Sequence, residues 1–316
     1  MSLFGDSEDV SGTVRYALVG LGWIVQEVVL PGFKGAKNSE LAALVTDDPK
    51  KAEKLSGKYK IDQVTGYQDY DPLLSSGAVD AVYLGVPNHL HKDFTIRAAR
   101  AGVHVLCEKP MANNVTECEE MIRAAEENNV KLMIAYRLHF EPGNLHAIEL
   151  IESGEIGEPR IFSSVFSQQT PEGNIRLQKS MGGGPLMDMG VYPINAARYL
   201  FRDEPLEVVG VGANSGDPRF KEVHEMVTAV LRFPGERIAA LTYSFGAAAA
   251  DAYQVVGTKG ELWMQPAFDY HAPLKMKTKI DGKEKETTFD RVDQFGGEIE
   301  YFSRCILRDA EPEPSG

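Results

Sequence analysis

Residues 14–25 read VRYALVGLGWIV, and this stretch decides the fold. Its first part is rich in β-branched and large apolar residues, which is typical of a buried strand, and a helical pattern follows the glycines. Glycines at such a turn let the backbone approach a pyrophosphate, whose charge meets the amides and dipole of the helix start. The stretch therefore predicts a dinucleotide-binding strand–turn–helix unit with Gly20, Gly22, Trp23 and Ile24 at the cofactor.

Apolar runs alternate with helical patterns through the rest of the first 137 residues. The further strand candidates are residues 41–45, 79–84, 103–107 and 131–135. Strands that alternate with helices indicate βαβ units and hence a parallel sheet. We therefore predict an α/β fold whose first domain, residues 1–137, is a Rossmann-type parallel sheet with helices on both faces.

The pattern changes in the second half, where strands follow one another with few helices between them. The candidates are residues 160–167, 207–213, 223–233, 237–245, 252–256, 275–280 and 283–289. Asp281-Gly282 lies between the last two and is a strong hairpin signal. One helix is expected from Pro185 to about Leu200, after a glycine run at 182–184 that resembles a flexible approach. We predict an α+β domain with a mostly antiparallel sheet over residues 138–316.

The composition is that of a globular protein, with 43% hydrophobic and 25% charged residues in 316. The 33 basic and 46 acidic residues leave a net charge of −13, which argues against a general nucleic-acid or membrane-surface binder. No apolar run reaches the ~18 residues of a membrane span, and residues 1–12 are polar and acidic, unlike a secretory signal, so we expect a cytoplasmic protein.

The cysteines and histidines give no metal signal. Three cysteines without a close-spaced pair predict neither a disulfide framework nor a zinc site. His89 and His91 stand two apart with no third ligand nearby in the sequence. We expect no bound metal.

Asp47 follows the second strand, 22 residues after Val25, close to the ~20-residue spacing of an acid that binds the adenosine ribose. A carboxylate there accepts hydrogen bonds from the ribose hydroxyls and repels a 2′-phosphate, which favours NAD. Thr46 and Lys51 could instead help to hold the phosphate of NADP. A third interpretation is that Asp47 only shares a helix cap with Asp48.

Two more loops follow strands of the predicted parallel sheet, where ligands bind in such folds. One contains Pro87, Asn88 and His91, and the other contains Glu108 and Lys109. A lysine at this edge can stabilise a developing alkoxide, although a Glu–Lys surface pair is the commoner role.

In the second half, Asp188 and Tyr192 are four residues apart on one helix face. Tyrosine can carry a proton for an alcohol, and a tyrosine packed between helix and sheet is the structural alternative.

These motifs together resemble the glucose–fructose oxidoreductase, inositol dehydrogenase and MocA family of NAD(P)-dependent oxidoreductases. The resemblance extends from Val14 to about Leu307 and depends on the glycine turn, on Glu108-Lys109-Pro110, on residues 135–137 (AYR) and on residues 182–195 (GGGPLMDMGVYPIN). It is greatest to the branch of glucose–fructose oxidoreductase and aldose dehydrogenases, because many other members have histidine where Tyr192 stands.

The resemblance implies roles for these residues. Lys109 would touch the reacting hydroxyl and the nicotinamide ribose, Tyr192 would exchange the proton, and Asp188 would orient the sugar. The other implied cofactor residues are Pro87, Asn88, His91, Glu108, Arg137 and Arg176. The implied reaction moves a hydride between the nicotinamide of NAD or NADP and a sugar, most simply an aldose oxidised at C1.

The sequence departs from the family pattern in three places. Val25 replaces the usual small third residue of the glycine fingerprint, and Ile175-Arg176 replaces a Trp-Arg pair. Members commonly continue into one more helix where this sequence reaches Gly316, so we expect the chain to be slightly short there.

Two other functions remain open: a non-catalytic dinucleotide-dependent sensor, and an oxidoreductase of keto-sugars, anhydro-sugars or inositols. The expected assembly is a homodimer or homotetramer formed through the C-terminal sheet.

Overall fold

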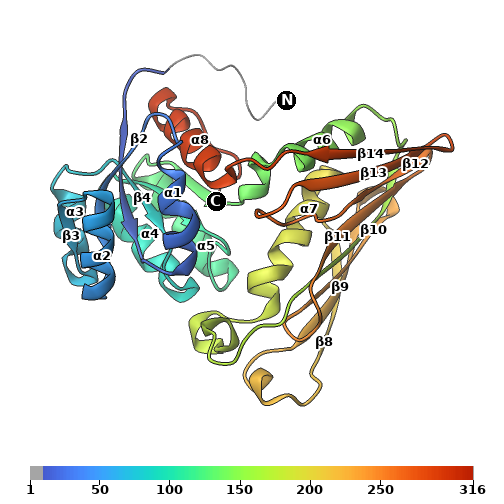
Figure 1. Cartoon of the computed structure of the whole chain (residues 1–316), viewed down its shortest axis with the longest axis horizontal. Coiled ribbons are helices and arrows are strands. Elements are labelled where there is room, and N and C mark those ends of the chain that lie inside the picture. Colours follow the sequence, from blue (N-terminus) through green and yellow to red (C-terminus); the bar gives the residue numbers. More distant parts are fainter. Residues whose placement is uncertain (1–9, 316) are drawn as a thin grey trace. The chain divides into compact units, whose positions relative to one another are not determined.

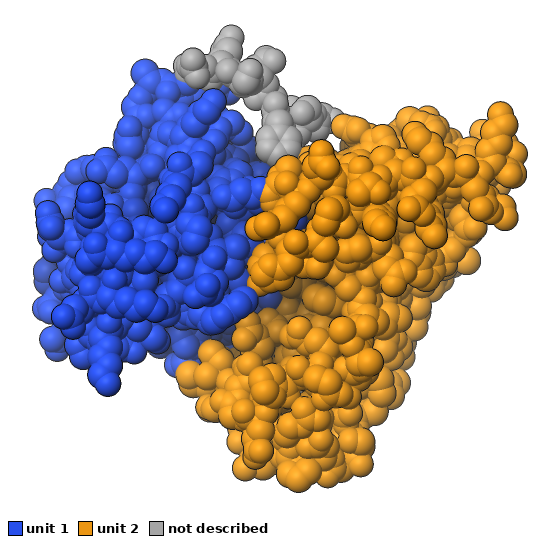
Figure 2. Space-filling model, in the orientation of Figure 1, with its two compact units in different colours: residues 1–140, 293–316 blue, residues 141–292 orange. Residues whose placement is uncertain are grey.

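The computed structural model describes residues 10–315, which form two compact units (Figure 2). Unit 1 contains the described residues up to Phe140 together with those from Asp293 onward, and unit 2 is Glu141–Val292. Most of the polar N-terminal stretch from which a cytoplasmic location is predicted lies outside the described residues. In the part that is described, no helix is both long and apolar enough to cross a membrane.

Unit 1 is built on a six-stranded parallel sheet, sheet A, with the strand order β3-β2-β1-β4-β5-β6. This is the order of the dinucleotide-binding fold, so the predicted Rossmann-type sheet is confirmed. The strands are β1 (Val14–Val19), β2 (Ser39–Val45), β3 (Gln63–Thr65), β4 (Ala81–Leu84), β5 (His104–Glu108) and β6 (Leu132–Ala135). Only the short β3 was not expected from the sequence.

Helices cover both faces of sheet A (Figure 1). The helical segments of unit 1 are η1 (Val25–Val29), α1 (Leu30–Gly32), α2 (Pro49–Tyr59), η2 (Tyr67–Asp69), α3 (Tyr70–Ser75), η3 (Asn88–Leu90), α4 (His91–Arg100), α5 (Val115–Glu127), η4 (Arg137–Phe140) and α8 (Gln294–Arg308). Alternate strand residues such as Val19 and Val82 pack with Phe94 of α4 and Met121 of α5. The strands are therefore buried on both faces, which explains their continuous apolar runs.

The last helix, α8, returns from the end of the chain to pack on unit 1. The hydroxyl of Tyr16 in β1 lies 2.8 Å from that of Ser303, and Ile299 and Phe302 of α8 are fully buried. The sequence-based division assigned everything after residue 137 to one domain. Here the first boundary falls close to that position, but the segment from Asp293 onward packs with the first unit.

Unit 2 is built on an eight-stranded sheet, sheet B, with the order β14-β13-β12-β11-β7-β10-β9-β8. The strands are β7 (Pro159–Ser167), β8 (Glu207–Ala213), β9 (Met226–Phe233), β10 (Arg237–Ser244), β11 (Ala250–Gly257), β12 (Gly260–Met264), β13 (Leu274–Ile280) and β14 (Lys283–Phe289). All neighbours are antiparallel except β7 and β10, so the predicted, mostly antiparallel sheet is confirmed. Asp281 and Gly282 both have positive φ, as a tight hairpin requires.

Two helices, α6 (Pro142–Glu152) and α7 (Val191–Phe201), lie on one face of sheet B (Figure 1). The short helical turns are η5 (Ile175–Leu177), η6 (Lys179–Met181), η7 (Leu186–Gly190), η8 (Pro218–Phe220) and η9 (Pro234–Glu236). The helix expected after Pro185 is present, but its first turn, η7, is π-helical. The opposite face of sheet B is exposed at many apolar positions.

Candidate functional site

The predicted cofactor loops of unit 1 all follow the carboxyl ends of strands. The loops after β1, β2, β4 and β5 leave sheet A at one edge, because parallel strands end on the same side. This edge includes the turn at Gly20 and Gly22, Asp47, the Pro87–Asn88 segment and Lys109. The topology therefore brings the predicted unit 1 residues to the edge where ligands bind in folds of this kind.

The glycine turn after β1 is packed against the loop after β4. A Cβ on Gly20, whose φ is +84°, would lie 2.8 Å from the backbone of Gly85. A Cβ on Gly85 would in turn lie 2.3 Å from Cγ2 of Val25. The bulk of Val25, which departs from the usual fingerprint, is therefore accommodated by the missing side chain of Gly85.

Gly22 has a different reason to be glycine. A Cβ there would meet only the Gly85 carbonyl oxygen, at 3.9 Å, so packing alone does not require a bare backbone. An approaching ligand would require it, which is the use that the fingerprint makes of this position. Trp23 follows with 63% of its surface exposed, and a π-helical turn, η1, begins two residues later. This open turn fits a pyrophosphate.

Asp47 and Asp48 have separate tasks after β2. Asp48 caps α2 by accepting hydrogen bonds from the amides of Lys50 and Lys51, both at 3.1 Å. Asp47 is exposed, and its Oδ1 accepts a hydrogen bond of 2.7 Å from the amide of Tyr67. The interpretation of Asp47 as part of the α2 cap is therefore wrong.

The two residues that could favour NADP have local partners. The hydroxyl of Thr46 accepts a hydrogen bond from the Asp48 amide at 3.2 Å, and Thr46 is buried. The ammonium of Lys51 lies 3.4 Å from Asp48 Oδ2. Both side chains therefore serve the start of α2 in this structure.

The loop after β5 holds Lys109 through its neighbours. Glu108 accepts a hydrogen bond from the Tyr83 hydroxyl on Oε1, at 2.8 Å, and one from the Lys109 amide on Oε2, at 3.2 Å. The Lys109–Pro110 peptide bond is cis. Because both oxygens of Glu108 are engaged, its carboxylate fixes the backbone from which the Lys109 side chain extends.

His91 is placed differently from the prediction of a cofactor ligand. It is fully buried at the start of α4, with Nδ1 2.9 Å from the Pro110 carbonyl and Nε2 3.0 Å from the Val86 carbonyl. Burial lowers the pKa of His91 despite these two contacts. The ring thus bridges the loops after β4 and β5, so it can position the lysine loop without touching a ligand.

Helix α8 contributes two buried polar residues to unit 1, Gln294 and Glu298, and the sequence analysis missed both. Arg137, a predicted cofactor residue, is 5% exposed and donates to Oε1 of Gln294 at 2.6 Å. Glu298 is buried one turn further along the helix. A signal was available, because Glu298 lies among the apolar positions of Phe295, Ile299 and Phe302 on one helix face.

In unit 2, the predicted site residues are held by the glycine run and η7. Arg176 Nε lies 2.9 Å from Asp188 Oδ2, so these two predicted residues form an ion pair. The Gly184 amide donates to the Arg176 carbonyl at 2.8 Å, and a Cβ on Gly183 would lie 2.4 Å from that oxygen. The glycines that were expected to form a flexible approach pack closely against the segment that supplies Arg176.

Tyr192 lies in the first turn of α7 and packs against aromatic rings. Its ring centroid is 5.7 Å from that of Phe166 in β7 and 6.0 Å from that of Phe268. Asp188 lies one turn earlier in the same helical segment. The packing fixes the direction of the phenol, which suits a positioned proton carrier and also fits a structural aromatic residue.

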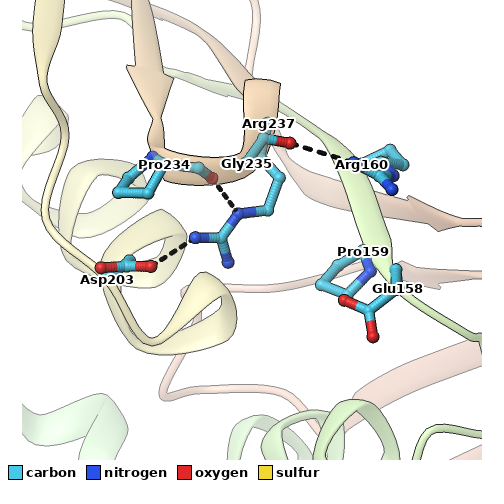
Figure 3. Close-up of a pocket in the computed structure, with 7 residues that line it drawn as sticks. All are labelled: Glu158, Pro159, Arg160, Asp203, Pro234, Gly235 and Arg237. Carbon is cyan, nitrogen blue, oxygen red and sulfur yellow. Dashed lines mark hydrogen bonds and ion pairs between the residues drawn. The ribbon is translucent and has the colours of Figure 1, made fainter.

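A pocket of about 480 Å³ lies elsewhere on unit 2 (Figure 3). Arg237 is committed there, because it donates to the carbonyls of Pro234 and Phe201, both at 2.7 Å, and pairs with Asp203. None of the predicted site residues lines this pocket. Among the described residues, no group of three or more His, Cys, Asp or Glu side chains could hold a metal ion.

Known proteins are similar to this chain in both sequence and fold. A D-xylose 1-dehydrogenase [NADP(+)] from Haloarcula marismortui is 33% identical over 96% of this chain and 86% of that protein. The crystal structure of an aldose-aldose oxidoreductase from Caulobacter crescentus, complexed with glycerol, has a TM-score of 0.92 and 36% identity, covering 96% and 92% of the two chains. A 3-ketoreductase from Actinomadura kijaniata, in complex with NADP and TDP-benzene, has a TM-score of 0.86 and 30% identity over the same shares.

Family profiles match both halves of the sequence. Residues 14–136 match the oxidoreductase family with an NAD-binding Rossmann fold, and residues 144–263 match the GFO/IDH/MocA C-terminal domain. The resemblance drawn from the motifs is thereby confirmed: the chain belongs to the GFO/IDH/MocA family of oxidoreductases.

Proposed function

We propose that the protein is an NAD(P)-dependent sugar oxidoreductase that acts on an aldose at C1. The observation that carries the proposal is the Glu108–Lys109 loop, which holds a lysine at the ligand-binding edge of a dinucleotide-binding sheet. The names of relatives support the substrate class, because a xylose 1-dehydrogenase and an aldose-aldose oxidoreductase are among them. Oxidation at C1 removes a hydride from carbon and a proton from oxygen, and leaves a lactone.

The chain's own residues have separate tasks in this proposal. The open turn at Gly22 and the exposed Trp23 hold the dinucleotide, and Asn88, Pro87 and Glu108 line its nicotinamide end. When bound, the nicotinamide supplies the acceptor or donor of the hydride. Positioning the sugar against it is the work of the protein.

Proton transfer and charge stabilisation fall to Lys109 and Tyr192. The Tyr192 phenol exchanges a proton with the sugar hydroxyl, and the Lys109 ammonium stabilises the negative charge that develops on that oxygen. Asp188, held by Arg176 at 2.9 Å, accepts hydrogen bonds from sugar hydroxyls and orients the ring. Arg176 then acts through Asp188, and His91 and Arg137 act by positioning the loops around the cofactor.

A substrate panel tests this function directly. Aldoses, inositols and keto-sugars are incubated with the protein and with either oxidised or reduced NAD and NADP, and the absorbance of the reduced cofactor is followed. We expect turnover of an aldose in the oxidising direction. Turnover confined to keto-sugars would instead support the reductase alternative, to which the similarity with a 3-ketoreductase points.

In this proposal, the residues that follow β2 favour NAD as the cofactor. Asp47 is exposed where the adenosine ribose binds in this fold, while Lys51 and Thr46 are engaged at α2. We expect Asp47→Ser to shift the ratio of kcat/KM for NAD and NADP toward NADP by at least tenfold, because a carboxylate repels a 2′-phosphate. Asp62→Ser, at another exposed acid, serves as the control. An unchanged ratio in Asp47→Ser would remove Asp47 from cofactor selection.

A second copy of the chain is the partner proposed for sheet B. Val209 and Val211 of β8 are 69% and 65% exposed, and Ile161 and Val165 of β7 are 49% and 46% exposed. The strand register puts these side chains on the same face, opposite α6 and α7. A contiguous apolar face of this kind marks an interface, and a homodimer buries it against its own copy.

A further inference from the structure

Glu298 is a buried acid to which the proposed reaction gives no role. The residue is 0% exposed, and neither Oε1 nor Oε2 has a hydrogen-bond partner among the described residues. An isolated buried carboxylate is costly, so such a group either keeps its proton or is solvated by an internal water. The burial and the two unpartnered oxygens together therefore call for an explanation.

Helix α8 packs against β5 and η4. The groups that interact electrostatically with Glu298 are Glu108 at the end of β5, Arg137 in η4 and Tyr83 of β4. Burial, reinforced by the negative charge of Glu108, raises the pKa of Glu298 well above its ordinary value, and Arg137 opposes this effect. An ionised Glu298 would be repelled by the negative charge of Glu108, and the neutral acid avoids this repulsion.

Other polar groups on elements that pack against α8 have partners elsewhere. His104 of β5 accepts a hydrogen bond of 2.9 Å from the Lys131 amide, and the ring centroid of His139 in η4 lies 6.4 Å from that of Tyr136. Tyr16 of β1 bonds to Ser303, and Arg15 pairs with Asp80 at 2.7 Å. On α8 itself, Glu300 pairs with Arg304 at 3.0 Å. The remaining acids of β2 and η1 that face these elements, Glu40 and Glu27, are exposed.

Glu108 connects this buried group to the lysine loop. Its Oε2 accepts the amide hydrogen of Lys109, and its Oε1 accepts the hydroxyl hydrogen of Tyr83. A change of charge or position at Glu108 is therefore transmitted to the backbone of Lys109. A group that interacts with Glu108 can therefore affect how firmly that backbone is held.

We propose that Glu298 is a positioning residue: as a neutral acid it is joined through a buried water to the carboxylate of Glu108 and the guanidinium of Arg137, and so fixes the Glu108–Lys109 segment. The water satisfies carboxyl oxygens that no group of residues 10–315 reaches. The effect on turnover depends on the proposed function of Lys109, whereas the state of the Glu298 proton does not.

The first test follows thermal unfolding against pH without any cofactor. A folded-state pKa above the unfolded value of 4.5 means that the folded chain keeps a proton that the unfolded chain loses. The retained proton makes its full contribution to the free energy of unfolding below pH ~4.5, and this contribution declines as the pH rises toward the folded pKa. Residue 298 of the Glu298→Gln variant cannot titrate. We therefore expect the Tm of this variant, relative to that of the wild type, to rise by roughly 2–5 °C for each pH unit in this window.

A matched control lies on the same helix. Glu300 is ion-paired with Arg304 and partly exposed, so Glu300→Gln controls for the loss of a carboxylate from α8 without a change in the interior. If the curve of Glu298→Gln runs parallel to the wild type, Glu298 holds no extra proton and the proposal is overturned.

The second test separates positioning from simple packing. Glu298→Leu keeps the volume but removes the polar link, and a purely structural role predicts that it is at least as stable as the wild type with unchanged kcat. We expect kcat to fall at least tenfold in Glu298→Leu and the sugar KM to change little, with Glu298→Gln recovering most of the loss. A Glu298→Leu protein with wild-type kcat would overturn the positioning role.

The two proposals can fail separately. If no sugar in the panel is turned over, the proposed function fails, but the pH dependence of Tm still tests the Glu298 proton. Cofactor affinity can then replace kcat as the measure of the loop, read from the fluorescence of Trp23 in a Trp263→Phe background, since the chain has two tryptophans. We expect Glu298→Leu to weaken that affinity at least threefold, and equal affinity would again overturn the positioning role.

Discussion

Lys109 is the residue whose removal should separate chemistry from cofactor binding. The Glu108 carboxylate and Tyr83 fix the backbone of its loop independently of its ammonium group. We therefore expect Lys109→Ala to lose roughly 10²–10³-fold in kcat, in line with the loss of one preorganised electrostatic group, while the cofactor dissociation constant changes by less than about fivefold. Steady-state kinetics and Trp23 fluorescence measure the two quantities.

A lysine at the opposite edge of sheet A provides the control for this change. Lys131 precedes β6 and pairs with Glu311 at 2.6 Å and Asp309 at 3.0 Å, away from the carboxyl ends of the strands. Lys131→Ala should leave kcat within twofold of the wild type. Near-normal turnover in Lys109→Ala would exclude the proposed role of its ammonium group.

Tyr192 carries its proposed function in a single oxygen atom. Its ring packs against Phe166 and Phe268, and a phenylalanine keeps both contacts. Tyr192→Phe should therefore unfold near the wild-type temperature and lose roughly 10²–10⁴-fold in kcat, the usual contribution of a positioned proton carrier. Calorimetry and kinetics on the same sample check this. A loss smaller than threefold would reduce Tyr192 to a packing residue.

At the scale of elements, two glycine turns each lead into a helix that begins with a π-helical turn. Such turns are rare and occur often at functional sites. The first, η1, follows Gly22 in unit 1, and the second, η7, follows Gly184 in unit 2. In both units some of the predicted functional residues thus lie within or next to the unusual turn, Trp23 and Ile24 in unit 1 and Asp188 and Tyr192 in unit 2.

The contact between Val25 and Gly85 gives a test of how the first turn is built. Gly85→Ala should destabilise the protein by about 1–3 kcal/mol, because its Cβ would lie 2.3 Å from Val25 Cγ2 and overpack the turn. Val25→Ala in the same chain removes that atom and leaves the Gly20 carbonyl, at 3.4 Å, as the nearest group. We expect the double variant to recover most of the stability in thermal unfolding. Additive losses would show that the two loops do not share this space.

Elements with a local sequence signal were predictable, and those formed by distant segments were not. The run at residues 14–19 and the Asp281-Gly282 turn carry their structure in a few neighbouring residues, so β1 and the β13–β14 hairpin were predicted. The return of α8 to unit 1 depends on packing with β1, which no local pattern reveals. The same limit applies at Gly183, whose bare backbone is needed because the Arg176 carbonyl lies close by.

At the scale of the whole molecule, the net charge of −13 opposes the approach of an anionic dinucleotide. In the proposed function this attraction is local and comes from the amides and dipole of the helix start after Gly22. Neither the charge nor the composition indicated this function. The function is indicated instead by a few residues placed at the carboxyl ends of the strands of sheet A.

The exposed face of sheet B leads to the last prediction, on assembly. A stable dimer buries about 800 Å² on each partner, and the apolar outer face of β7, β8 and β10 offers side chains suited to such a contact. We expect the wild type to sediment as a dimer or tetramer and Val165→Glu, which places a charge on this face, to shift it to smaller species. Val115→Glu is the matched control, since Val115 is 72% exposed on α5 of unit 1. A monomeric wild type, or equal effects of both changes, would contradict assembly through sheet B.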